Sequence, residues 1–151
     1  MNFCEYRNWK LRLNGTPRPK GSWTAYRGNF VKPKTLAQME ESYLWQIRAS
    51  KPPMLNPIEC AVEVEADFLF RWPTRAAKRD RTDGAYKNST PDLDKLIRAL
   101  LDVLVQGRVI ADDRQVVNVS ASKSWTWNEP GTDVWVATVD NFWPACEVHD
   151  E

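Results

Sequence analysis

The sequence predicts an α+β (α/β) fold, with one mixed β-sheet of about four or five strands and two main helices packed on it. Apolar and polar residues alternate, as is typical of strands, in four segments: 8–14, 58–70, 115–127 and 133–140. Helical spacing of apolar residues occurs at 35–50 and at about 91–105. The length of 151 residues suits one domain. We expect that domain over residues 1–140 and a C-terminal tail over 141–151.

The N-terminal part of the chain predicts a strand, an uncertain segment and a helix. The strand at 8–14 stops at Gly15, before a proline-rich turn. Residues 24–32 suit either a second, irregular strand or an ordered loop. Thr35 is a good N-cap, and the helix that follows it through about Ser50 carries one apolar stripe, which should lie on the sheet. The stripe is formed by Leu36, Met39, Tyr43, Leu44 and Ile47.

The most clearly alternating strand, 58–70, leads into a basic segment and then into the second helix. That helix is expected from about Pro91 to Val105, with Gly107 as its C-cap. Its inward stripe is Leu93, Leu96, Ile97, Leu100, Val103 and Leu104. The strands at 115–127 and 133–140 are separated by a turn, so we expect them to pair as an antiparallel hairpin.

Composition limits the class of protein. Cys4, Cys60 and Cys146 match no zinc or redox spacing, which favours free thiols in a reducing compartment. No run of 18 apolar residues and no signal-peptide core occurs, so we expect a cytoplasmic protein that has no contact with the membrane. The net charge of +1 implies no particular partner, so the distribution of charge carries that question.

Positive charge gathers between residues 71 and 87. This segment has six basic residues against two acids and almost no aliphatic side chain, so we expect a mobile loop over 71–89. Its cations suit contacts with DNA phosphates, although a solvated linker would also have this composition. Lys20 and Lys123 are further candidates for phosphate contacts. Trp23 and Trp72 would either pack against apolar neighbours or stack on bases.

Carboxylates flank the second helix at both ends. Asp92 and Asp94 stand at its start, and Asp112 and Asp113 follow its end. Asp residues at helix starts and turns often act only as caps, and Asp94 could pair with Arg98 one turn later. The helix is about 20 Å long, and a returning segment could bring Asp113 back beside Asp92. Since His149 is the single histidine, a cluster of these acids would suit Mg²⁺ or Mn²⁺ better than zinc.

The same residues resemble a known family, the RusA-type Holliday junction resolvases. The resemblance rests on Pro91-Asp92-Leu93-Asp94, then Ala99-Leu100-Leu101-Asp102, Gly107 and Asp112-Asp113-Arg114-Gln115-Val116, in this order. It is specific over residues 91–123 and weaker over about 11–125. It implies an endonuclease of bacterial or phage origin that resolves four-way DNA junctions by metal-dependent hydrolysis with paired symmetric nicks, in recombination and repair.

The resemblance also implies roles for individual residues. Asp92, Asp94 and Asp113 would be the essential metal ligands, with Mg²⁺ as the cofactor and Mn²⁺ possible. The family's helix has an asparagine where this chain has Lys95, and its catalytic lysine is replaced by Arg98. Arginine keeps the charge but does not release a proton, so Arg98 would only stabilise charge on the phosphate.

The resemblance further implies a homodimer, which the near two-fold symmetry of a four-way junction also favours. The side chains expected to contact DNA are Lys20, Arg71, Arg75, Lys78, Arg79, Arg81 and Lys123. Two other functions remain open from the residues alone. One is a metal nuclease that acts on flaps or replication forks, and the other is a non-catalytic DNA-binding module.

Overall fold

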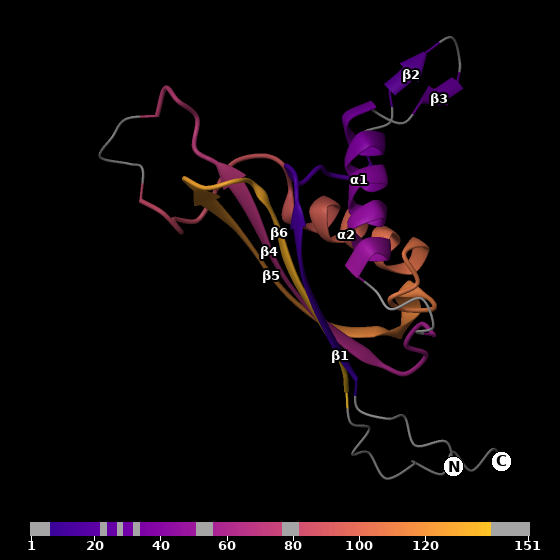
Figure 1. Cartoon of the computed structure of the whole chain (residues 1–151). Coiled ribbons are helices and arrows are strands. Elements are labelled where there is room, and N and C mark those ends of the chain that lie inside the picture. The colour runs from indigo at the N-terminus through magenta and orange to yellow at the C-terminus, as the bar shows by residue number, and fades with distance from the viewer. Residues whose placement is uncertain are drawn as a thin grey trace, which may run out of the picture.

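The computed structural model describes residues 7–21, 24–26, 29–31, 34–50, 56–76 and 82–139. The elements, in chain order, are β1 (Asn8–Asn14), β2 (Thr24–Tyr26), β3 (Asn29–Val31), α1 (Lys34–Ser50), β4 (Val62–Arg71), α2 (Leu93–Gln106), the short 3₁₀ helix η2 (Asp113–Gln115), β5 (Val116–Thr126) and β6 (Gly131–Thr138). Both helices lie on the same side of the main sheet (Figure 1). The α+β architecture with one mixed sheet and two helices is therefore confirmed.

The main sheet has four strands in the order β1-β6-β4-β5. β4 pairs with β5 in parallel and with β6 in antiparallel fashion, so the expected β5–β6 hairpin is wrong. β5 and β6 do run antiparallel to each other, but β4 lies between them. Neighbouring strands are about 4.8 Å apart and an extended residue spans about 3.3 Å, so the four-residue link Trp127–Pro130 is long enough to pass one strand.

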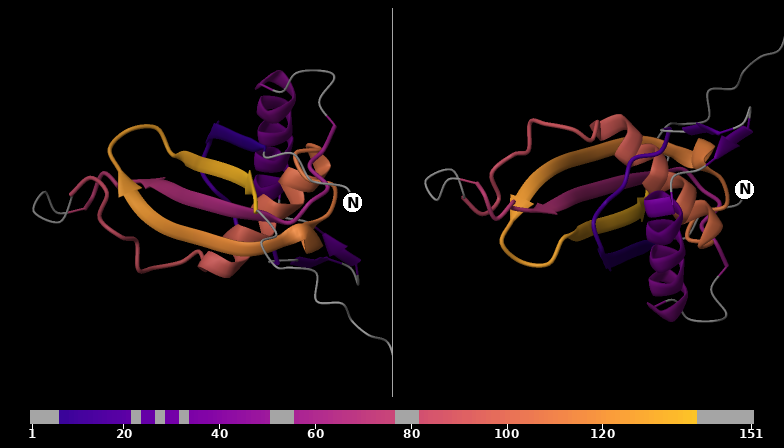
Figure 2. Two further views of the ribbon diagram at one scale, coloured as in Figure 1. Left: turned by 90° about the horizontal axis from the view of Figure 1, so that it is seen from below. Right: turned by 90° about the horizontal axis from the view of Figure 1, so that it is seen from above.

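β4, α2 and β5 form a parallel β-α-β unit, and its direction decides where the site lies. The register pairs Val62 with Val116 at one end and Arg71 with Thr126 at the other. The loop after β4 extends beyond the ends of the strands and returns to the start of α2 (Figure 2). α2 then runs back toward the beginning of β5. Its first residues therefore lie near the carboxyl ends of two parallel strands, where ligands of α/β sheets commonly bind.

The core lies between the sheet and the two helices. The buried side chains of α1 are Leu36, Met39, Glu40, Tyr43 and Ile47, and those of α2 are Leu96, Ala99, Leu100, Val103 and Leu104. The expected stripes are thus largely confirmed. Gly107 is the C-cap of α2, and an added Cβ there would lie 2.9 Å from a methyl carbon of Ile47. Its lack of a side chain lets the end of α2 approach α1.

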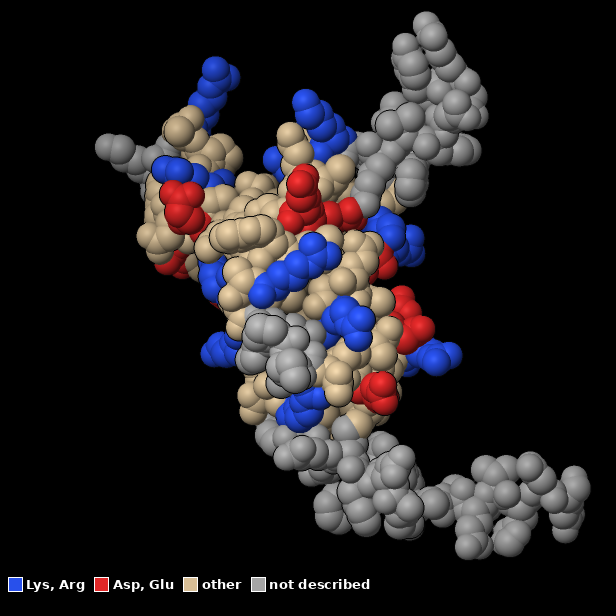
Figure 3. Space-filling model, turned by 45° about the vertical axis from the view of Figure 1, so that its right-hand side comes forward, with Lys and Arg blue, Asp and Glu red and all other residues tan. Residues whose placement is uncertain are grey.

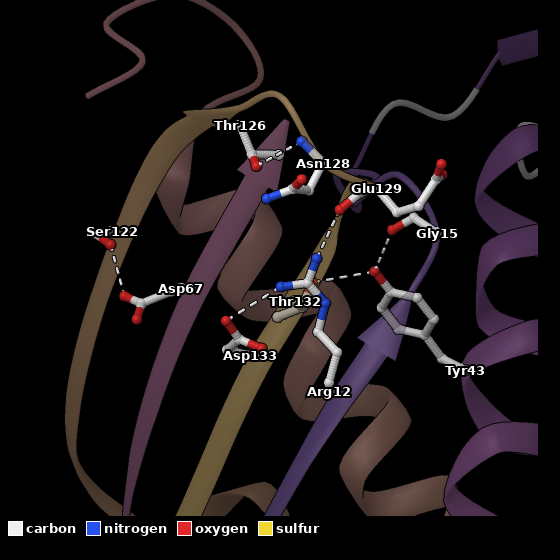
Figure 4. Close-up of polar contacts among 10 residues, drawn as sticks. All are labelled: Arg12, Gly15, Tyr43, Asp67, Ser122, Thr126, Asn128, Glu129, Thr132 and Asp133. Carbon is white, nitrogen blue, oxygen red and sulfur yellow. Dashed lines mark hydrogen bonds and ion pairs between the residues drawn. The ribbon is translucent and has the colours of Figure 1, made fainter. Parts of the chain in front are cut away.

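Tyr43 joins α1 to the sheet. Its hydroxyl donates a hydrogen bond to the carbonyl oxygen of Gly15 and shares another with the hydroxyl of Thr132 (Figure 4). Burial raises the pKa of Tyr43 to about 12, although the bond to Thr132 acts in the opposite direction. Gly15 has φ +120°, which suits glycine, and it starts the turn that leads to Lys20. Tyr43 therefore fixes the base of that turn.

Several boundaries and local expectations differ from the structure. β4 begins at Val62, and Ile58 instead makes an isolated bridge with Ile110. Residues 24–32 contribute the short pair β2 and β3. Cys60 is disulfide-bonded, so the expectation of a free thiol there is wrong, and its partner lies outside the described residues. The tail at 141–151 is also outside them. None of the described helices is long and apolar enough to cross a membrane.

Candidate active site

Asp92 occupies the N-cap position of α2 and Asp94 lies in its first turn. A carboxylate at an N-cap normally accepts a backbone N–H of the first turn, but the Asp92 side chain makes no capping hydrogen bond. One oxygen instead lies 3.3 Å from the ammonium of Lys95, and 55% of the side chain is exposed. The Asp92 carboxylate is therefore available for a ligand at the positive end of the α2 dipole.

Two lysines hold the segment that precedes Asp92. The ammonium of Lys123, on β5, donates to the carbonyl oxygens of Ser89 and Pro91, both at 2.8 Å. The ammonium of Lys87 donates to the hydroxyl of Ser89 and to the carbonyl oxygen of Thr90, both at 2.6 Å. Three consecutive carbonyl groups before Asp92 thus accept hydrogen bonds from ammonium groups. Such charge-assisted bonds are stronger than neutral ones, so the backbone before Asp92 is firmly placed.

Lys87 is the least exposed of the basic residues here, at 9%. Its ammonium lies 4.4 Å from the ring centroid of Trp125 and 5.4 Å from that of Phe70, within cation–π range of both rings. Burial, with a contribution from the charge of Lys123, lowers the pKa of Lys87. From the sequence, Lys87 is expected only as one cation of a mobile loop. Its position in the sequence does not predict that its ammonium lies against the rings of Trp125 and Phe70.

The C-terminal part of the loop expected to be mobile is hydrogen-bonded to β5. Tyr86 forms an antiparallel bridge with Ser124, and the backbone N–H groups of Gly84 and Lys87 donate to carbonyl groups of β5. Residues 84–87 therefore lie along the outer edge of β5. Residues 77–81 are outside the described residues.

An open pocket of about 440 Å³ lies beside Asp92, and we call it the α2 pocket. Its walls come from the turn after β1, the end of β4 and the start of α2. They are formed by Thr16, Pro17, Arg18, Pro19, Phe70, Lys87, Thr90, Pro91, Asp92 and Lys95. Three cations, Arg18, Lys87 and Lys95, thus surround one carboxylate. Cations around an acidic group suit an anionic substrate that meets a metal-binding carboxylate.

Asp113 lies at the other end of α2. The helix has 14 residues and is therefore about 21 Å long. Ala111 donates its N–H to the carbonyl oxygen of Ile58, and Gln115 donates its side-chain amide to those of Ile58 and Cys60. These bonds place the Asp113 segment near the beginnings of β4 and β5, whereas Asp92 lies near their ends. Among the described residues, no three acidic, His or Cys side chains gather in a metal-binding group.

Asp112 is a structural cap. Its carboxylate accepts the N–H of Arg114, and its own N–H donates to the side chain of Gln115, which completes a capping box around η2. The hydrogen bond from the Arg114 backbone, with smaller effects of the Asp113 side chain and the Arg114 charge, holds the pKa of Asp112 below its usual value. The Asp112 side chain is thus engaged in the cap of η2, and Asp112 is not among the ligands that the resemblance implies.

Arg98 is exposed, four residues after Asp94 on α2. An ion pair between the side chains of Asp94 and Arg98 would have explained both residues by helix stability alone. Within the part of the chain that the structure describes, no ion pair joins them. The Arg98 guanidinium and the Asp94 carboxylate thus remain accessible to a ligand.

The other cations expected to contact DNA have different surroundings. Lys20 forms an ion pair with the half-buried Asp102 of α2. Arg71 is 64% exposed and lies 3.9 Å from Glu129, and Arg75 is exposed. Lys78, Arg79 and Arg81 lie outside the described residues. On the face drawn in Figure 3, basic and acidic side chains are interspersed rather than gathered into one basic patch.

A comparison with known protein families identifies a match. The model of a family described as "Endodeoxyribonuclease RusA" matches residues 13–137, which is most of the chain and includes both Asp92 and Asp113. No curated protein sequence matches this chain.

Proposed function

Because the chain belongs to the RusA family of endodeoxyribonucleases, which cut Holliday junctions, we propose that the α2 pocket is where it hydrolyses the DNA phosphodiester. The observation that carries this proposal is the carboxylate of Asp92. It stands at the positive end of α2 without a capping bond and faces a pocket with three cations. Asp94 lies two residues further along the chain, in the first turn of α2, and is also exposed.

The residues present suit a divalent metal with a preference for oxygen ligands. Mg²⁺ keeps several waters and is commonly held by only one or two carboxylates, so Asp92 and Asp94 suit the part of such a site that one chain contributes. No histidine or cysteine lines the α2 pocket, which disfavours zinc. When bound, Mg²⁺ or Mn²⁺ would neutralise charge on the phosphate and make a bound water more acidic.

The cations of the site would bind the DNA phosphate. Lys95 reaches Asp92 and can approach an anion placed beside that carboxylate. Lys87 lines the same pocket, and its ammonium, which is bound to Ser89 and Thr90, adds positive charge to the wall. Arg98 follows Asp94 by one turn and keeps its charge at every relevant pH. We assign Arg98 the stabilisation of the negative charge that grows on the phosphate during hydrolysis. Lys123 acts differently, because its ammonium is already bound to the carbonyl groups before Asp92.

We further propose that the active form is a homodimer in which Asp113 of the partner subunit joins Asp92 and Asp94. One protomer holds these carboxylates at opposite ends of a helix about 21 Å long, too far apart to share one ion. A two-fold axis between antiparallel α2 helices would bring the unlike ends together twice. Two equivalent sites would result, as paired symmetric nicks require.

The remaining basic residues would follow the DNA backbone. Arg71 and Arg75 extend from the end of β4, and we place Lys78, Arg79 and Arg81 in the same role with Lys20. Phosphate contacts of this kind supply affinity without sequence preference and weaken steeply with salt.

The substrate class is tested by supplying synthetic four-way junction, replication fork, flap and linear duplex of matched arm sequence with Mg²⁺. We expect junction to be cut fastest, with the Asp94→Asn variant inactive on every substrate. Asp67→Asn is the control, because Asp67 lies on the helix-free face of the sheet and accepts a hydrogen bond from Ser122 that asparagine can keep. Faster cutting of forks or flaps would replace the junction assignment. Binding without cutting of any substrate would reduce the chain to a DNA-binding module.

A further inference from the structure

Three tryptophans form a cluster beyond the end of the sheet, and we call them the tryptophan cluster: Trp72, Trp125 and Trp127. The rings of Trp72 and Trp125 stack, with centroids 4.6 Å apart and an angle of 15° between planes. The Trp127 ring is tilted by 39° against Trp72, at 6.5 Å. Trp72 and Trp125 are partly buried, whereas 44% of Trp127 is exposed. The cluster therefore ends in an aromatic ring that solvent reaches.

The inner two rings hold the loop after β4 to the sheet. Trp72 donates from its indole N–H to the carbonyl oxygen of Thr82, and Trp125 packs under Lys87, so both hold the loop after β4 to the sheet. Trp127 follows the end of β5 and extends the stack outward. Exposure of a large apolar ring to water is unfavourable in free energy, and a planar ligand stacked on Trp127 would bury that surface.

The cluster is connected to the α2 pocket on one side of the sheet. The ammonium of Lys87 lies over Trp125 and also donates to the carbonyl oxygen of Thr90. Phe70 pairs with Trp125 across β4 and β5, and it lines the pocket together with Asp92. A DNA strand with one base on the cluster can thus place a nearby phosphate beside Asp92.

The charges around the cluster suit a nucleic acid. Arg71 and Arg75 precede and follow Trp72 in the exposed segment at the end of β4, and Lys87 adds a third cation. Two acids are also near: Asp83 accepts the N–H of Trp127, and Glu129 faces Arg71. Aromatic rings next to cations are the usual platform for unpaired bases, because every base has a π-face and every nucleotide a phosphate.

We infer that the tryptophan cluster, through the exposed ring of Trp127, stacks on a base that is unpaired or unstacked at the branch point of the junction. This inference rests on the proposed function and adds the contact that distinguishes a branch from a linear duplex. Bases inside a continuous duplex are stacked on both faces, so away from the duplex ends a base face becomes available at a branch. The cluster then fixes which phosphate enters the α2 pocket.

The test compares DNA binding in Ca²⁺, without turnover, by wild type and three variants: Trp127→Ala, Trp127→Phe and Trp127→Lys. A four-way junction with 2-aminopurine at the branch and a linear duplex of the same sequence are the probes. We expect Trp127→Ala to lose roughly 5- to 100-fold in junction affinity, the effect of one base–aromatic stack, with duplex affinity within twofold. The phenylalanine variant should bind like wild type. The lysine variant, which adds charge without a ring, should bind junction as weakly as the alanine variant.

Two controls separate stacking from other effects. Trp45→Ala removes a 70% exposed tryptophan of α1 outside the cluster and should change nothing. An abasic nucleotide at the branch tests the same contact with wild-type protein, independently of how well any variant folds, and should reduce affinity as Trp127→Ala does. Wild type should change the 2-aminopurine fluorescence on binding, and Trp127→Ala should not.

Equal loss on junction and duplex would overturn the inference, as would tight junction binding by Trp127→Ala or unaltered binding of the abasic junction. A role in binding another protein would leave all DNA affinities unchanged, which likewise contradicts it. These outcomes differ from failure of the proposed function, in which wild type itself would show no preference for the junction. In that case both the proposed function and the stacking role of Trp127 would be wrong.

Discussion

Lys123, near the end of β5, donates from its ammonium to the carbonyl oxygen of Pro91, the residue before Asp92. This bond joins the sheet directly to the start of α2, and a second bond from the same ammonium reaches Ser89. The position of the Asp92 carboxylate thus depends on a side chain that is distant in sequence. Lys123 is a positioning residue in this account, not a residue that contacts the reacting atoms.

Replacement of Lys123 by methionine should therefore slow junction cleavage about 10- to 100-fold, because misplaced catalytic groups lose rate steeply. Single-turnover kinetics should show the loss in the rate of cleavage at saturating enzyme, with a smaller change in junction affinity. Lys123→Arg should recover part of the rate, since arginine can reach the same carbonyl groups. Lys10→Met, at an exposed lysine of β1, is the control. If Lys123→Met instead lost junction affinity by a similar factor while the cleavage rate at saturating enzyme stayed unchanged, Lys123 would be assigned to phosphate binding.

Lys20 and Asp102 should stabilise the fold as a pair. Both side chains are less than one-third exposed, and the pair ties the turn after β1 to α2. We expect a coupling free energy of about 1 kcal/mol in a double-mutant cycle of Lys20→Met and Asp102→Asn, measured by urea unfolding. Additive effects would show that the pair contributes nothing. If Lys20 also contacts DNA, Lys20→Met alone should weaken junction binding, while Asp102→Asn should not.

Tyr43→Phe should destabilise the protein by about 1 to 2 kcal/mol at pH 7, because it removes the hydroxyl bonded to Gly15 and Thr132. The pKa of Tyr43 is raised from 10.0 to about 12 in the folded protein. The unfolded chain therefore releases this proton first, so the stability of wild type is complete below pH 10 and declines as the pH rises toward 12.

The difference in unfolding free energy between wild type and Tyr43→Phe should accordingly shrink in alkaline solution. Urea unfolding at pH 7 and pH 11 measures it. Tyr86→Phe is the control, because Tyr86 is 80% exposed. A difference that stays constant with pH would contradict the buried hydroxyl as its source.

Mixing two inactive variants should restore cleavage if the site is shared between protomers. In a heterodimer of Asp92→Asn and Asp113→Asn chains, one shared site carries both substitutions and the other carries neither. We therefore expect one nick per junction from an equimolar mixture after subunit exchange, at about a quarter of the wild-type rate of nicking, because about half of the dimers are heterodimers with one active site each. A site built within one chain would stay inactive in every combination. Each variant alone and the Asp67→Asn variant mixed with wild type provide the reference rates.

The sequence predicts the elements of this fold better than their pairing. Strand periodicity and the apolar stripes of the helices locate β1, α1 and α2 closely, because burial of one face imposes those patterns. The pairing of β5 with β4 is not local information. A short turn between two alternating segments predicts a hairpin, and only the packing of α2 across β4 and β5 shows that β4 occupies the position between them.

The candidate site, like the fold, can be predicted from the sequence only in part. The carboxylates and Arg98 can be named from the sequence because their spacing follows a family pattern. Lys87 and the stacking of Trp72 on Trp125 cannot, because both depend on how the loop after β4 folds back along β5. The separation of Asp113 from Asp92 could not be predicted from the sequence either. The segment after α2 is long enough to return to Asp92, but in the parallel β-α-β unit it leads to the start of β5, so the two residues lie at opposite ends of α2.

The most direct measurement of the central claim is the cleavage of a four-way junction by the Asp92→Asn variant across a Mg²⁺ titration, with the nicks mapped. We expect wild type to make two symmetric nicks with Mg²⁺ and none with EDTA. Asp92→Asn should cut at least about a hundredfold more slowly while it still binds the junction, and Asp67→Asn should cut like wild type. Cleavage by Asp92→Asn at the wild-type rate, or cleavage by wild type that EDTA leaves unchanged, would contradict a metal-dependent centre at the start of α2.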